Sequence, residues 1–121
     1  MTSEWLSPYS RPGIGIFDKE LIIDMITYAF EFDGNWWVLS KCRDTHEKVA
    51  RQLLMTCLMD HAGFRCKTAA RVCGQTHANA LHAKKIIHET YMHDSEYGRL
   101  VNEIYDRCRR EGKLITLPSE I

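Results

Sequence analysis

The stretch that decides the fold is residues 65–88, which read RCKTAARVCGQTHANALHAKKIIH. A short helix is predicted over about 67–73, and Gly74 suits a tight turn because glycine tolerates a positive φ. A longer helix is predicted to open near Thr76 and to run to about residue 91. Two helices joined by a short turn that contains glycine are the signature of a helix-turn-helix. The sequence therefore predicts this motif.

The second helix of the motif opens with small polar side chains. They are Gln75, Thr76, His77 and Asn79, and the lysines Lys84 and Lys85 follow one to two turns later. Such an end fits among base edges in a major groove of DNA. The motif thus predicts a DNA-binding module.

Three more helices are predicted outside the motif. One covers residues 19–32 with Asp18 as its N-cap, and a central one covers 45–61, where Asp44 and Glu47 form a capping box. Gly63 is expected to cap the end of the central helix. A last helix is predicted over 96–111, capped by Asp94 and Ser95 and stopped by Gly112. The fold class is all-α, a bundle of about five helices with a helix-turn-helix.

The chain has 121 residues, the length of one domain. Residues 1–17 are predicted to form an irregular arm, residues 18–112 the helical domain and residues 113–121 a short, partly ordered tail. Trp36 and Trp37 open a connecting piece to Lys41, where they serve the core and its rim or a stacking platform.

The formal net charge of zero hides an uneven distribution. Residues 1–40 carry two basic and six acidic side chains, residues 41–90 nine and four, and residues 91–121 five and six. The positive charge lies in the segment with the two-helix motif, as binding to phosphates requires. Chance clustering on a solvated surface is the alternative.

Five cysteines form an odd set without a CxxC pair, which indicates free thiols in a reducing compartment. The N-terminus lacks the pattern of a signal peptide, and Asp24 interrupts the longest apolar run. We expect a cytoplasmic, nucleoid-associated protein without membrane contact. No metal-ligand spacing or nucleophile signature is found, so neither a metal, a cofactor nor an enzymatic activity is predicted.

Three landmarks carry a resemblance to a known family. They are LSKCR at 39–43, ARQLLM at 50–55 and GQTHANALHAKKI at 74–86. In order and spacing they resemble motifs of the DNA-binding C-terminal domain of the bacterial replication initiator DnaA, over about three quarters of the chain. This resemblance implies the all-α fold of that domain, which is also similar to the Trp repressor. No GxxxxGK[ST] phosphate loop is present, so we expect a stand-alone bacterial or phage relative without the ATPase domain.

The resemblance also implies roles for individual residues. Arg43 takes the place of the arginine that enters the minor groove, and Lys41 neighbours the DNA backbone. Residues 75–79 take the positions that meet bases and phosphates, but only His77 matches the family residue. Gln75 replaces an arginine suited to guanine, and amide side chains suit adenine. A target other than the initiator's usual site is therefore expected.

Each further candidate has an ordinary alternative. Arg65, Lys67, Lys84 and Lys85 are either phosphate contacts or solvated side chains, and Arg51 makes either a phosphate contact or a structural ion pair. His77 contacts DNA or caps its own helix. The complete set of predicted contacts is Lys41, Arg43, Arg65, Lys67, Gln75, Thr76, His77, Asn79, His82, Lys84 and Lys85.

The predicted function is sequence-specific binding of double-stranded DNA in replication or transcription control, with a homodimer or a protein partner aiding affinity. The alternative is a helical protein–protein adaptor that kept the fold and binds through the Trp36/Trp37 surface or the arm.

Overall fold

The computed structural model describes the backbone of residues 19–120 and the side chains of residues 19–111. This part of the chain is all-helical and has no strand, which confirms the all-α prediction. Among its five α-helices, the short 3-10 helix η2 lies between α2 and α3, and the short 3-10 helix η3 lies between α5 and α6. The elements are α2 (Lys19–Ala29), η2 (Asn35–Val38), α3 (Thr45–His61), α4 (Cys66–Val72), α5 (His77–Glu89), η3 (Tyr91–His93) and α6 (Gly98–Glu120). The predicted arm and the Asp18 cap lie outside the described residues.

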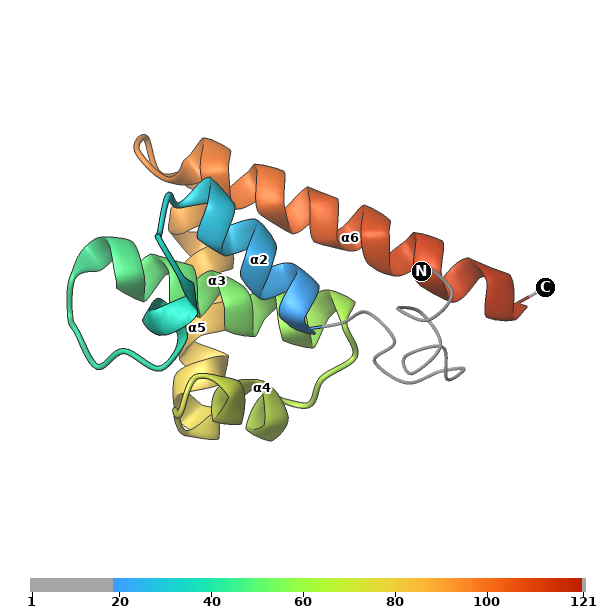
Figure 1. Cartoon of the computed structure of the whole chain (residues 1–121), viewed down its shortest axis with the longest axis horizontal. Helices are drawn as coiled ribbons and strands as arrows, with labels where there is room; N and C mark the ends of the chain where they lie inside the picture. Colours follow the sequence, from blue (N-terminus) through green and yellow to red (C-terminus); the bar gives the residue numbers. More distant parts are fainter. Residues whose placement is uncertain (1–18, 121) are drawn as a thin grey trace.

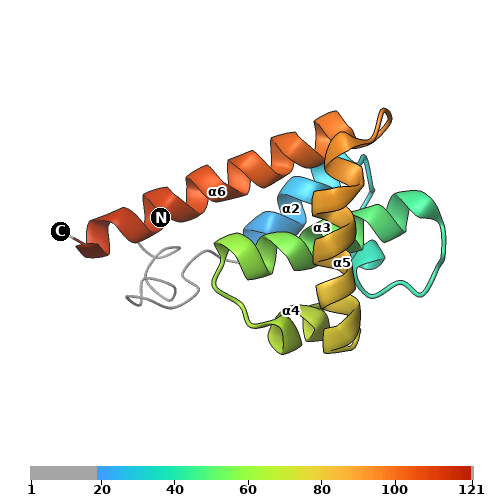
Figure 2. The same ribbon diagram turned by 180° about the vertical axis from the view of Figure 1, so that it is seen from behind.

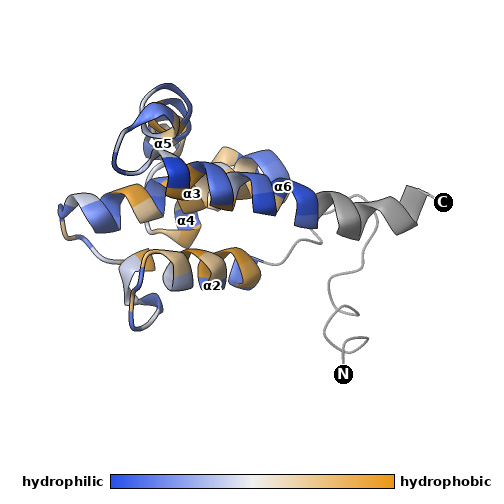
Figure 3. Ribbon diagram, turned by 90° about the horizontal axis from the view of Figure 1, so that it is seen from above, coloured by the Kyte–Doolittle hydropathy of each residue, from blue (hydrophilic) through white to orange (hydrophobic). Residues whose placement is uncertain are grey.

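Helix α3 is the centre of the bundle, and every other α-helix packs against it. Figures 1 and 2 show α6 along one side of the molecule and α4 at the opposite side, with α5 crossing α3 between them. Figure 3 shows α2 coloured largely as hydrophobic and the coloured part of α6 largely as hydrophilic, and the buried residues of α2 are Ile22, Ile23, Met25 and Ile26. Helices α4 and α5, which carry six of the eleven predicted DNA contacts, both pack against α3.

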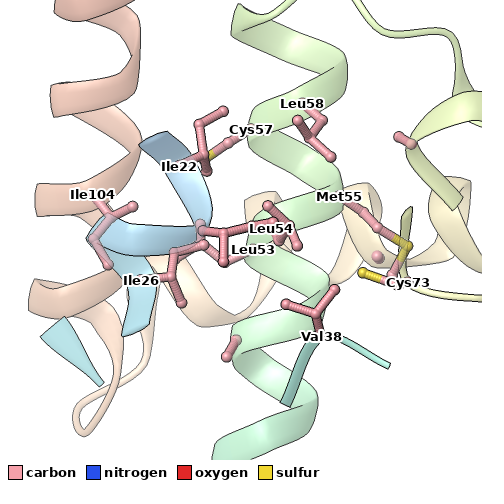
Figure 4. Close-up of a cluster of buried hydrophobic side chains, with 14 of the residues drawn as sticks. Ile22, Ile26, Val38, Leu53, Leu54, Met55, Cys57, Leu58, Cys73 and Ile104 are labelled. Atoms are coloured by element: carbon pink, nitrogen blue, oxygen red, sulfur yellow. The ribbon is translucent and has the colours of Figure 1, made fainter. Parts of the chain in front are cut away.

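The core lies where α2, α3 and α6 meet. Figure 4 shows Ile22 and Ile26 of α2 between α3 and α6, close to Leu53 and Ile104. Trp37 is fully buried, and its indole N–H donates to Thr27 Oγ1 at 2.9 Å. The largest fully buried side chains are Trp37, Phe30, Ile22, Ile26, Leu53, Leu54, Leu58, Ile87, Val49, Val101 and Thr56.

The predicted ends of α3 are partly confirmed. Asp44 is the N-cap and accepts the backbone N–H of His46 at 3.2 Å. Gly63 follows the helix with φ of 78°, and the N–H of Phe64 donates to the carbonyl of Leu58, which is the expected glycine ending. The capping box was wrong, because Glu47 does not turn back to the start of its helix. Its carboxylate accepts the hydroxyl of Ser40 instead.

Helix α2 ends three residues earlier than predicted. Glu31 takes a positive φ of 62°, and the N–H of Phe32 donates to the carbonyl of Thr27 at 2.9 Å. This ending lets Phe30 enter the core and lets Phe32 stack on Trp37 with ring centroids 5.5 Å apart. Aromatic packing therefore decides where the helix ends.

The observed bounds of α4, α5 and α6 also differ from the predicted ones. Helix α4 is shifted by one residue, and α5 ends at Glu89, where η3 begins a short link to α6. Asp94 does cap the segment before α6, since it accepts the N–H groups of Glu96 and Tyr97. Helix α6 begins at Gly98 and continues through Gly112 to Glu120, so the predicted stop and short tail were wrong. A glycine inside a helix costs only about 1 kcal/mol and does not have to end it.

Candidate nucleic-acid interface

A tight turn joins α4 to α5. Gly74 has φ of 65°, and the N–H of Gln75 donates to the carbonyl of Ala70 at 2.9 Å. A Cβ added to Gly74 would lie 3.5 Å from the Leu39 side chain and 3.6 Å from Lys41 Nζ. The turn therefore lies directly against the loop of residues 39–43.

A hydrogen bond joins the basic loop to this turn. Lys41 Nζ donates to the carbonyl of Gly74 at 3.3 Å. Arg43 is exposed and has no ion pair or hydrogen bond from its side chain among the described residues. The structure thus brings together two regions that the sequence analysis predicted separately.

The buried side chain of Arg51 holds the backbone of the loop of residues 39–43. It donates to the carbonyls of Trp37 at 3.2 Å and Cys42 at 2.7 Å. It also pairs with Glu47 at 3.7 Å, and Ser40 links Glu47 to the backbone N–H of Cys42. Arg51 is therefore structural, the second of its two predicted alternatives. The sequence signal that we missed is the four-residue spacing of Glu47 and Arg51 on one helix, which predicts such a pair.

The first turn of α5 carries the predicted reading residues. Thr76 is the N-cap and accepts the N–H of Asn79 at 3.3 Å. The Asn79 side-chain amide donates to Gln75 Oε1 at 2.8 Å, so the two amides form a pair. His77 is exposed at the first helical position, and it does not cap the helix.

A hollow of about 250 Å³ separates the basic loop from α5. The exposed cations Lys41, Arg43 and Lys48 line it together with the buried Arg51, and no aspartate or glutamate among the described residues does. Gln75, Asn79 and His82 form the opposite wall. The remaining lining side chains are uncharged. An anion is the chemical group that suits such a hollow.

Similarity to known proteins gives no guide to the role of this hollow. No protein-family model and no curated protein matches this chain. The resemblance to the initiator domain therefore rests only on the three landmarks. The structure adds that the first two are in contact, because Arg51 of the second holds the backbone of the first.

The predicted contacts Arg65, Lys67, Lys84 and Lys85 do not line the hollow. Arg65 is the residue before α4, and Lys67 is in its first turn, both exposed. Lys85 is exposed on α5 and has no ion pair among residues 19–111. Lys84 instead pairs with Asp60 at 2.9 Å, so part of its charge is neutralised within the protein.

Asp60 is the centre of a polar cluster that the sequence analysis missed. It accepts hydrogen bonds from His88 of α5 at 2.8 Å and Tyr105 of α6 at 2.6 Å, besides its pair with Lys84. Burial acts to raise the pKa of this carboxyl, but the three partners outweigh burial and lower its pKa. The cluster ties α5 and α6 to α3.

Within residues 19–111, no three His, Cys, Asp or Glu side chains gather in a way that could hold a metal ion. Burial raises the pKa of the Cys57 thiol and raises that of Cys73 to about 12, so both stay protonated and are poor ligands. No helix in the described part of the chain is long and apolar enough to cross a membrane.

Proposed function

We propose that this chain binds double-stranded DNA, with α4 and α5 acting as a helix-turn-helix. Helix α5 docks in the major groove, and the loop at Lys41–Arg43 reaches the adjacent minor groove. The observation that carries the proposal is the hollow between these two elements, which the exposed cations Lys41, Arg43 and Lys48 line and which no carboxylate of the described residues lines. The phosphates of a DNA strand are anions that fit this charge.

The geometry supports a joint role for the loop and the helix. Lys41 touches the turn that starts α5, and buried Arg51 fixes the backbone of the loop beside it. A loop held in this way is preorganised, so little conformational entropy is lost when DNA binds. Arg43 is exposed on this fixed loop, and its guanidinium has no partner among residues 19–111.

The biological role that we propose is control of replication or transcription by a stand-alone relative of the initiator's DNA-binding domain, located with the nucleoid. The mechanism is non-enzymatic and uses no cofactor. Basic side chains neutralise phosphates, and the exposed residues at the start of α5 select the site. A homodimer or a partner protein supplies additional affinity.

The test is selection of binding sites from a pool of random duplex DNA, followed by a salt titration on the enriched sequence. With about four to six phosphate contacts, the logarithm of the association constant should fall against the logarithm of salt with a slope of about −4 to −5. Arg43→Glu should abolish binding. Arg107→Glu is the matched control, because it makes the same charge reversal at an exposed position of α6 that does not line the hollow. Failure of the native chain to bind any duplex at low salt would refute the proposal.

A protein–protein adaptor is the second candidate function. Trp36 is 51% exposed and Tyr28 is 86% exposed, so large aromatic surfaces are available. Trp37 cannot contribute to such a surface because it is fully buried. Under this reading, Arg43→Glu leaves partner binding intact while Trp36→Ala weakens it.

A further inference from the structure

The amide pair formed by Gln75 and Asn79 has a place in the fold that the sequence did not indicate. Both side chains line the hollow, together with His82, and face the loop that carries Lys41 and Arg43. The hydrogen bond between them uses one N–H of Asn79 and the oxygen of Gln75. Two N–H groups of Gln75 and one of Asn79 remain as donors.

The helical period separates these residues from the outermost face of α5. Asn79 and His82 are three positions apart and share one flank of α5, and the hydrogen bond from Asn79 holds Gln75, which precedes the helix, beside them. Ala80, Ala83 and Ile87 are buried against the body of the protein. The face opposite this buried stripe carries Ala78, Leu81 and Lys85, all exposed; Leu81 is 52% exposed although it is a large apolar residue. The amide pair therefore lies beside the outermost face rather than on it.

A protein that places a loop in the minor groove and a helix in the adjacent major groove must straddle the sugar-phosphate strand between the two grooves. In this chain, the space between loop and helix is the hollow lined by cations and amides. Phosphate oxygens accept hydrogen bonds from Asn and Gln side chains as well as from Lys and Arg. The location of the hollow and the hydrogen-bond donors that line it therefore both favour a backbone phosphate as its ligand.

We infer that the Gln75–Asn79 pair, with His82 and the cations across the hollow, binds a backbone phosphate of the DNA, and that base reading falls to the outermost face with His77, Ala78 and Leu81. This inference rests on the proposed DNA binding. It departs from the expectation that Gln75 and Asn79 read adenine. It assigns apolar base contacts to Ala78 and Leu81, for which the methyl group of thymine is the matching chemistry in the major groove.

The test uses the enriched duplex with neutral methylphosphonate linkages placed one at a time along both strands. At one or two neighbouring linkages, neutralisation should weaken binding of the native chain by about tenfold, the order expected for one lost charge-assisted hydrogen bond. The double variant Gln75→Ala/Asn79→Ala should bind unmodified DNA more weakly by a similar factor. At those linkages it should lose less than the native chain does, because its amide contacts are already gone and only the cations across the hollow still contact the phosphate.

Base preference gives the second readout. The amide variant should bind every single-base variant of the site more weakly by the same factor, which leaves the preferences unchanged, whereas Leu81→Ala should relax the preference at one or two positions. Gln75→Glu is a variant of the same shape that puts a carboxylate into the hollow, and circular dichroism melting verifies that each variant folds. The loss of affinity in Gln75→Glu should also be the same for every site variant, and it should exceed the loss in Gln75→Ala.

Two results would overturn the inference while leaving DNA binding intact. One is a changed base preference in the amide variant, and the other is a loss at every linkage that is the same in the variant and in the native chain. Absence of duplex binding by the native chain overturns both the proposed function and this inference.

Discussion

Arg51 shows how one residue changes the interpretation of a charge pattern. It belongs to the basic middle segment of the sequence, yet its guanidinium is buried and donates to the carbonyls of Trp37 and Cys42. Its charge supports the loop from inside instead of forming part of an exposed surface. Lys84 is similar, because its ammonium group pairs with Asp60. The exposed positive charge is therefore concentrated in fewer residues than the sequence count indicates.

Arg51→Lys tests the supporting role at constant charge. Lysine presents one ammonium group in place of a planar fork, so it cannot reproduce both carbonyl contacts. We expect a stability loss of about 2 kcal/mol, the size of one lost hydrogen bond to a charged group. DNA affinity should fall by about tenfold, because the loop loses its preorganisation. Urea unfolding and titration of the enriched duplex measure the two effects. Unchanged affinity in a destabilised variant would show that the loop position does not matter.

Among the elements, the α4–α5 turn depends most on one backbone conformation. Gly74 has φ of 65°, whereas a Cβ added there would have ordinary contacts with Leu39 and Lys41 at 3.5 and 3.6 Å. The demand on this position is thus conformational and not steric crowding.

Gly74→Ala should destabilise the protein by about 1–2 kcal/mol, the cost of a left-handed conformation in a residue with a Cβ. Gly34→Ala is the matched control, since Gly34 has an extended φ of 178° and an added Cβ would lie 3.5 Å from Trp36. The control should change the free energy of unfolding by less than about 0.5 kcal/mol. Thermal melting of both variants makes the comparison, and equal losses would contradict the conformational explanation.

Local sequence signals predicted the elements well where capping and apolar period decide. Asp44 begins α3 and Gly63 follows its end, as expected, and the turn at Gly74 lies where predicted. The prediction missed features that depend on contacts between elements. Glu31 ends α2 because two phenylalanines pack inward, and Glu47 leaves its expected capping partner for Ser40. The hollow could not be foreseen, because it arises only when residues 40–43 and 75–82 are packed together.

At the scale of the whole molecule, the Asp60 cluster fixes the direction of α5. Asp60 lies on α3, Lys84 and His88 on α5, and Tyr105 on α6, so one carboxylate connects three helices. These polar links lie at the edge of the apolar core, against which Tyr105 packs. They set how α5 projects from the body, and hence how it would meet DNA.

Asp60→Asn should lower the free energy of unfolding by about 2 kcal/mol, because the hydrogen bonds to a charged group weaken and one ion pair is lost. The variant should also lose less stability in acid. The native carboxyl has a lowered pKa, so its stabilising effect is complete above the ordinary value of 3.8 and disappears as pH falls below it. Unfolding by urea at pH 7 and pH 3 measures both effects. An acid-induced loss of the same size in the native chain and the variant would contradict this role.

His61 should make the stability of the protein depend on pH in a second range, at mildly acidic pH. Burial lowers the pKa of its imidazole below 6.5, its buried Nε2 atom has no hydrogen-bond partner among the described residues, and its ring packs on Tyr105 with centroids 4.3 Å apart. Because the unfolded chain takes up the proton more readily than the folded one, stability should fall as pH drops through 6.5. The melting temperature should therefore be lower at pH 5.5 than at pH 7.5. In His61→Phe, which keeps a ring against Tyr105, this difference should shrink, whereas in His93→Gln, at an exposed position, it should persist. If the His61→Phe variant kept the full difference, the proton uptake would have to be assigned to another histidine.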